Sequence, residues 1–102
     1  MHARIVAGLA QPGTIDQGIN IFENSVAPVA QEQKGFKDIF FLVNRDTNQF
    51  MSITLWETEA DMAAGEASSY LQEQVAKAAP ILAAPPTTEH YELAAQTQGE
   101  KR

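Results

Sequence analysis

The segment between residues 36 and 57 constrains the fold of this chain most strongly. Two runs rich in aromatic and β-branched residues, Phe36–Asn44 and Gln49–Glu57, are separated by the short polar loop Arg45–Asn48. Strand-like runs joined by a short loop that contains Asp and Asn are typical of a β-hairpin. The sequence therefore predicts two adjacent antiparallel strands in the middle of the chain.

Strand and helix patterns lie on both sides of this hairpin. The apolar run Arg4–Leu9, closed by a turn with Pro12 and Gly13, predicts a first strand. Helical periodicity follows over about 14–33 and again over about 58–79, and alternation returns over 87–95. The order β-α-β-β-α-β is that of the ferredoxin-like α+β fold, a four-stranded antiparallel sheet with both helices on one face. We expect one such domain over 1–95 and a polar tail over 96–102.

Local signals mark the start of the second helix and the weak points of both. Thr58 stands at an N-cap position, with carboxylates in the turn that follows. Pro28 lies inside the first helix, where it removes one backbone hydrogen bond, so we expect a kink near Asn24. In the second helix, Gly65 and the pair Ser68-Ser69 predict a bend or a break.

Composition limits how the chain is stabilised and what it binds. Its 102 residues include no cysteine, so the hydrophobic core must stabilise the domain without disulfides or cysteine-based zinc sites. A net charge of −6 argues against nucleic-acid and anionic-membrane partners, because both need Lys and Arg. No apolar run approaches the roughly 20 residues of a membrane span, and the N-terminal segment lacks a signal-peptide pattern. We therefore expect a cytoplasmic protein.

Both faces of the predicted hairpin are apolar. Alternation sets Phe36, Phe40 and Leu42 against Ile39, Phe41 and Val43 on its first strand, and Phe50 and Trp56 against Met51, Ile53 and Leu55 on its second. Helices on one side of the sheet leave the other apolar face uncovered. Burying about 500 Å² of that face at ~25 cal/mol per Å² contributes roughly 10 kcal/mol before the costs of association. We expect a homodimer with the two sheets packed face to face.

Three segments of the chain form a recognisable series. They are Val26–Pro28 followed by Gly35-Phe36, the segment Ser52–Asp61 with its Leu-Trp-Glu element, and the closing segment Pro86–Leu93. In that order they resemble the dimeric α+β barrel group and, within it, the antibiotic-biosynthesis-monooxygenase-like domains. The resemblance implies the ferredoxin-like fold, a dimer, and a small organic molecule bound between the sheet and the helices. It also implies, as in some members, oxidation of an aromatic substrate without metal or flavin.

The catalytic sets of these relatives are mostly replaced in this chain. Haem-degrading members combine an Asn on the first strand with a Trp and a His on the second helix, where this sequence has Gly65 and Val75. Quinone-forming members pair a Trp at the end of the third strand with an Asn on that strand and a Tyr on the next helix. Trp56 matches the first of these, whereas Ser52 and Met62 occupy the other two positions.

Trp56 and His90 are the candidate catalytic residues. The indole N–H of Trp56 can orient a bound oxygen atom, although a single large aromatic at this junction also serves to fill the core. His90 suits general base catalysis, whereas a metal would need partner residues at ligand spacing that the sequence does not offer. Phe40, Thr54, Trp56 and Tyr70 are expected to line the pocket, with no metal and no cofactor.

Arg4 is a charged residue on an otherwise apolar strand. Such a guanidinium either pairs with a carboxylate across the sheet or binds an anionic substrate.

Two functions are consistent with these patterns. The first is a cofactor-independent oxygenase of the monooxygenase-like group that acts on a small hydrophobic molecule of aromatic or quinol type. The alternative is a non-catalytic dimeric binding or stress-related module with the same fold. Polar groups that converge on a void would favour the enzyme, whereas a space filled by Trp56, Phe22 and Met62 would favour the module.

Overall fold

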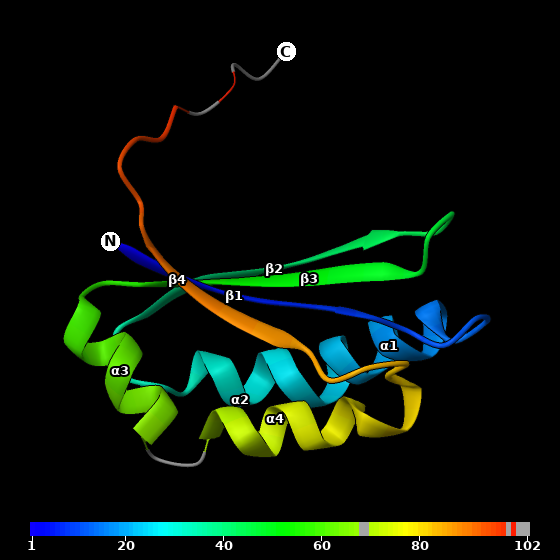
Figure 1. Ribbon diagram of the computed structural model, residues 1–102. Helices are drawn as coiled ribbons and strands as arrows, with labels where there is room; N and C mark the ends of the chain where they lie inside the picture. The colour runs from blue at the N-terminus through cyan, green and yellow to red at the C-terminus, as the bar shows by residue number, and fades with distance from the viewer. Residues whose placement is uncertain (68–69, 98, 100–102) are drawn as a thin grey trace.

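The computed structural model describes residues 1–67, 70–97 and 99, and shows one sheet covered on a single face by helices (Figure 1). The strands are β1 (His2–Leu9), β2 (Phe36–Asn44), β3 (Gln49–Trp56) and β4 (Thr87–Glu92). The helical elements are α1 (Ile15–Ile21), the π-helical turn η1 (Phe22–Val26), α2 (Ala27–Gln31), α3 (Glu59–Ala67), α4 (Tyr70–Ala78) and the 3₁₀ turn η2 (Ala79–Ile81). Their sequence along the chain is the predicted β-α-β-β-α-β order.

The sheet has four strands in the spatial order β2-β3-β1-β4, and every neighbouring pair is antiparallel. This arrangement confirms the predicted ferredoxin-like α+β fold. The hairpin is also confirmed, with strand pairing that begins at Asn44 and Gln49. Asn44 Oδ1 accepts hydrogen bonds from the backbone N–H groups of Asp46 and Thr47 at 3.0 and 3.2 Å, and Asn48 adopts a φ of 63°. Asn44 therefore stabilises the turn through its side-chain oxygen, and Asn48 contributes its tolerance of positive φ.

The first helical region is continuous but not uniform. It changes from α1 to the π-helical turn η1 and back to α2, with Pro28 near the start of α2. Because proline has no N–H to donate toward the carbonyl four residues earlier, a wider turn accommodates the lost hydrogen bond. The interruption predicted near Asn24 thus takes the form of a π-helical turn. Lys77 Nζ of α4 donates a hydrogen bond to the Ser25 carbonyl in this turn at 3.2 Å.

The second helical region begins as predicted, but Gly65 lies inside α3 and does not interrupt it. Thr58 Oγ1 accepts a hydrogen bond from the backbone N–H of Asp61 at 3.0 Å, which satisfies a first-turn donor of α3. Helix α3 ends at Ala67 and α4 begins at Tyr70, so the region forms two helices. Ser68 and Ser69, on which part of this prediction fell, lie outside the described residues.

One prediction about the faces of the sheet is wrong. Alternation placed Phe36 with Phe40 and Leu42, but the β2–β3 register shifts between Phe36 and Asp38. This bulge adds one residue to β2 and turns Phe36 to the helix-covered face, where its ring meets Trp56 edge-on at 6.3 Å. The core on that face contains Trp56 with two residues from the helical layer, Ala30 and Met62.

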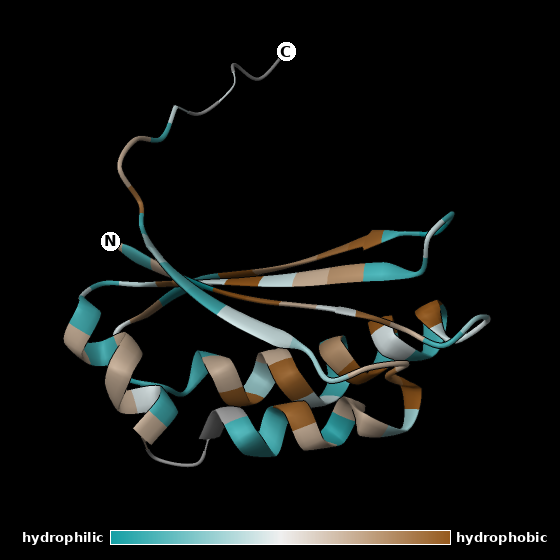
Figure 2. Ribbon diagram, viewed as in Figure 1, coloured by the Kyte–Doolittle hydropathy of each residue, from teal (hydrophilic) through white to brown (hydrophobic). Residues whose placement is uncertain are grey.

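The opposite sheet face, which we call the outer face, carries Ile5, Phe40, Leu42, Met51, Ile53 and Tyr91. Hydrophobic residues recur along the strands that form it (Figure 2). Phe40, Leu42 and Tyr91 are 45%, 53% and 50% exposed, respectively. The apolar character predicted for both faces is therefore present, and the outer face has no helix over it.

The last strand is shorter than predicted, since β4 ends at Glu92 and not at Ala95. Beyond it, the Leu93 N–H donates a hydrogen bond to the Met1 carbonyl at 2.8 Å. The domain boundary at residue 95 stays a prediction, and residues 98 and 100–102 of the predicted tail lie outside the described part. None of the described helices is long and apolar enough to cross a membrane.

Candidate functional site

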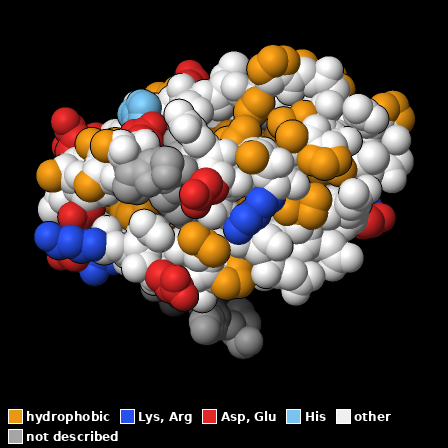
Figure 3. Space-filling model, turned by 90° about the horizontal axis from the view of Figure 1, so that it is seen from below, with side chains coloured by type: hydrophobic (Ala, Val, Ile, Leu, Met, Phe, Trp, Pro, Cys, Tyr) orange, Lys and Arg blue, Asp and Glu red, His pale blue; other side chains and the backbone are white. Residues whose placement is uncertain are grey.

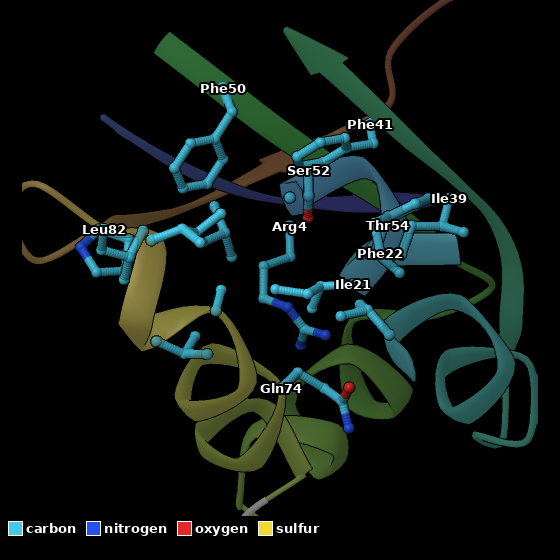
Figure 4. A pocket seen from close by; sticks show the side chains of 17 residues that line it. Arg4, Ile21, Phe22, Ile39, Phe41, Phe50, Ser52, Thr54, Gln74 and Leu82 are labelled. Carbon is cyan, nitrogen blue, oxygen red and sulfur yellow. The ribbon is translucent and has the colours of Figure 1, made fainter. Parts of the chain in front are cut away.

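A cavity of about 80 Å³ lies between the sheet and the helical layer. Its walls come from the helix-covered faces of β1, β2 and β3, from α1, η1 and α4, and from the segment between η2 and β4 (Figure 4). The volume is several times the roughly 10–15 Å³ that one water molecule needs. Seen from the helix side, hydrophobic side chains gather around a hollow in the surface (Figure 3). A binding space therefore exists in the layer that the fold brings together.

Aromatic side chains form one wall of the cavity. Phe22 of η1 stacks on Phe41 of β2 with ring centroids 4.9 Å apart and planes inclined by 17°. Phe41 in turn meets Phe50 of β3 at 5.9 Å. Rings in such a series offer flat, polarisable surface to a planar ligand. The wall joins the π-helical turn to the sheet, so its shape depends on the backbone around Pro28.

The other end of the cavity is polar. Arg4, Ser52 and Thr54 rise from neighbouring strands, and Gln74 faces them from α4 (Figure 4). Arg4, Thr54 and Gln74 are all buried. Polar groups that converge on an apolar cavity are typical of small-molecule sites, because they fix a ligand's orientation while apolar walls supply most of the contact.

Contacts from α3 and β3 hold Arg4 in place. Its Nη1 donates a hydrogen bond to the Met62 carbonyl of α3 at 3.3 Å, and its guanidinium carbon lies 5.0 Å from the centre of the Trp56 ring. The second contact is a cation–π geometry. These contacts fix a charged group at the junction of β1, β3 and α3.

Trp56 lies beside the cavity and does not line it. The indole is completely buried in the core with Ala30 and Met62, as the core-filling interpretation expects. Within the described part of the chain its Nε1–H has no hydrogen-bond partner. Trp56 supports the polar end through Arg4, which its ring contacts.

His90 lies one strand away from the cavity. It pairs with Arg4 in the β1–β4 register, so both side chains project from the same sheet face. The described residues that line the cavity do not include it. Its Nε2 instead lies 2.7 Å from Oε1 of Glu66 on α3, in a partly exposed pair. An imidazole that is hydrogen-bonded to a carboxylate has a fixed orientation, which favours proton transfer. His90 has this arrangement on the edge strand β4.

The structure brings together only part of the predicted pocket. Thr54 lines the cavity. Phe40 does not line the cavity. It pairs with Ile53, and consecutive residues Ile53 and Thr54 project from opposite faces, so Phe40 lies on the outer face. The side chain of Tyr70 lies outside the described part of the structure.

Sequence reasoning missed the aromatic wall and Gln74. Phe41 and Phe50 share the alternation parity of Ile39 and Trp56, and that pattern could have identified them. Gln74 carried no such signal, since a polar residue on an amphipathic helix usually faces solvent.

The described residues contain no group of three or more His, Asp or Glu side chains placed to hold a metal ion. Tyr91 donates a hydrogen bond to Glu89 Oε2 at 3.0 Å, and this bond raises the pKa of the exposed phenol. Both residues lie at the outer face and edge of β4, away from the cavity.

Comparison with known proteins places the chain in a family. The model of the antibiotic biosynthesis monooxygenase family matches residues 1–77. The chain belongs to this family. Curated proteins include no match to it. The matched part contains every strand and helix that lines the cavity except η2 and the end of α4.

Solved structures share the same fold at low sequence identity. A protein of unknown function from Nitrosomonas europaea has a TM-score of 0.75 and 24% identity, covering 98% of this chain and 95% of its own. A putative antibiotic biosynthesis monooxygenase from the same organism has a TM-score of 0.74 and 16% identity, with 93% and 100% covered. The ActVA-Orf6 monooxygenase of Streptomyces coelicolor, solved with the ligand nanaomycin D, has a TM-score of 0.72 and 19% identity, with 97% and 92% covered.

Proposed function

We propose that this protein is a cofactor-independent monooxygenase that oxidises a small aromatic substrate of quinol type in the cavity between the sheet and the helices. The observation that carries the proposal is the cavity itself, with an aromatic wall at Phe22, Phe41 and Phe50 opposite a polar end. Membership of the monooxygenase family supports it. So does the ligand nanaomycin D in the structurally similar Streptomyces monooxygenase.

The chemistry requires a substrate that is itself the reductant. A hydroxyarene loses a proton, passes electrons to O₂ and forms a carbon–oxygen bond as a hydroperoxide. Loss of water then leaves a quinone, so that one oxygen atom enters the product and the other leaves as water. The protein's contribution is to position the ring, exclude water and accept the proton.

Three of the predicted site residues, Thr54, Trp56 and His90, have a place in this proposal. Thr54 offers a hydroxyl to a substrate oxygen at the polar end, and Trp56 orients the substrate through the group it supports, Arg4. His90 accepts the proton at the sheet edge and is positioned by Glu66. Because His90 does not line the cavity, this step requires a relay between the substrate and the imidazole.

The test combines binding with oxygen consumption. Quinols, flavonoids and haem are titrated against the protein while Trp56 fluorescence is recorded, and O₂ uptake is measured with each compound that binds. We expect saturable quenching by a quinol or flavonoid, followed by O₂ uptake with a quinone as product. Saturable quenching by none of the aromatic compounds would reject the proposal.

A matched pair of variants shows whether binding occurs in the cavity. Thr54→Leu adds bulk to the cavity, whereas Thr87→Leu makes the same change at an exposed position of β4. We expect Thr54→Leu to abolish quenching and Thr87→Leu to leave it unchanged. Equal affinities in the two variants would place the ligand elsewhere.

The non-catalytic binding module remains the second candidate, because His90 stands outside the cavity. It predicts saturable binding of the same compounds without O₂ uptake. The two functions are thus separated by the oxygen measurement alone.

We also propose that the protein is a homodimer in which two outer faces pack together. Exposed Phe40, Leu42 and Tyr91 support this proposal, since large apolar groups gathered on one face are costly to leave in water. The dimer would complete the core of a domain that has no disulfide. Sedimentation equilibrium at micromolar concentration tests it, and a monomer there would reject it.

A further inference from the structure

The cavity has one charged group in an otherwise neutral lining. Among the described residues that line it, Arg4 alone carries a charged side chain, and no carboxylate is present. Arg4 is 1% exposed, so bulk water does not screen its charge as it would at the surface. A guanidinium stays protonated at any pH at which proteins fold. The lining is therefore cationic at one end and apolar at the other.

This charge is fixed in place. The Met62 carbonyl binds one nitrogen of Arg4 and the Trp56 ring lies beside the guanidinium, so the side chain need not reorganise when a ligand enters. Ser52 and Thr54 stand beside it with hydroxyl groups that can donate to an oxygen anion. A ligand oxygen at this end meets a positive charge and neutral donors.

We propose that Arg4 determines which form of the ligand is bound, and that the cavity selects the phenolate or enolate anion of a planar aromatic molecule over its neutral form. This inference rests on the proposed function for the aromatic class of the ligand. An opposite charge within about 4–6 Å lowers the pKa of an acid by roughly 1–3 units in a protein environment. The rings pack on the aromatic wall, while the anionic oxygen points to Arg4.

The test uses a probe whose ionisation state is measured by its absorbance. Umbelliferone has a phenol whose neutral and anionic forms absorb at different wavelengths, and 7-methoxycoumarin is the matched compound that cannot ionise. The absorbance of bound umbelliferone is followed from pH 5 to pH 9, and both compounds are measured by equilibrium dialysis. We expect the pKa of the bound phenol to fall by about 1 unit or more, and binding at pH 8 to be at least about tenfold tighter for umbelliferone than for the methyl ether.

Variants identify the group responsible. In Arg4→Gln the shift in the probe's pKa disappears and the two compounds bind equally, whereas Arg4→Lys keeps part of the preference. Arg45→Gln is the charge-matched control, because it removes one positive charge and an exposed ion pair with Asp16 at a position that does not line the cavity. The wild-type measurement needs no variant, so the inference can be tested even if Arg4→Gln fails to fold.

The outcomes separate this inference from the proposed function. Equal affinity of the wild type for both compounds would overturn the charge preference while leaving an aromatic site intact. Binding of neither compound would overturn it as well. A lowered phenol pKa without O₂ uptake by any substrate would support the inference and reject the oxygenase.

Discussion

The guanidinium of Arg4 and the ring of Trp56 lie 5.0 Å apart, with the indole completely buried and the arginine forming the cavity's polar end. The largest side chain of the core thus contacts the group that gives the cavity its charge. We therefore expect substitutions of Trp56 to affect the site through Arg4, although Trp56 does not line the cavity.

Replacement of Trp56 tests this coupling. Trp56→Ala leaves a large void and is expected to lower the free energy of unfolding by about 3–5 kcal/mol, whereas Trp56→Phe retains a ring and costs less. Urea denaturation followed by circular dichroism measures both. In Trp56→Phe we also expect weaker probe binding, and an unchanged affinity in a folded variant would show that Arg4 holds its position without the indole.

A charge on the outer face tests the dimer. Leu42→Asp places a carboxylate among apolar groups that the proposed interface buries, so we expect a monomer by sedimentation equilibrium. The control is Gln72→Asp, which adds the same charge at an exposed position of α4. Dimers that persist in Leu42→Asp would mean that the outer face is not the interface.

His90 and Glu66 provide a test of proton transfer. If His90 accepts the proton, His90→Gln lowers kcat by about 100-fold or more and leaves ligand affinity unchanged. Glu66→Gln keeps the imidazole but removes the carboxylate 2.7 Å from it, so a smaller loss is expected. Stopped-flow measurement of quinone formation distinguishes the two, and full activity in His90→Gln would reduce the pair to a surface ion pair.

Two glycines allow a local stability test with an internal control. Gly35 and Gly13 have φ values of 80° and 81°, where an alanine is strained. A Cβ at Gly35 would also overlap the Asp61 side chain, whereas open space surrounds Gly13. We expect Gly35→Ala to lower the free energy of unfolding by about 2 kcal/mol or more and Gly13→Ala by about 1 kcal/mol. Equal losses in urea denaturation would show that Asp61 moves aside at no cost.

Most of the fold follows from local sequence signals. The strands, the hairpin and the start of α3 come from alternation, turn residues and a cap, which act over a few residues. The face of Phe36 could not be predicted, because a bulge depends on how β2 meets β3 and leaves no mark in the alternation.

The site is less predictable than the fold because it depends on contacts between distant segments. Strand parity predicts that Thr54 shares a face with Trp56, and the hairpin register, which sets Phe40 opposite Ile53, excludes Phe40 from that face. Arg4 was ambiguous from sequence, since its contacts come from Met62 and Trp56, more than 50 residues along the chain. Only the folded chain shows that its charge lies at a cavity.

The bulge between Phe36 and Asp38 also bears on aggregation. Strand β2 is at the border of the sheet, where unpaired N–H and C=O groups could recruit a strand from another molecule. The backbone at 36–38 is irregular and includes the charged residues Lys37 and Asp38. It therefore interrupts the regular spacing of N–H and C=O groups that an incoming strand needs. At this edge of the sheet, a second copy of the chain therefore finds no continuous row of backbone groups to pair with.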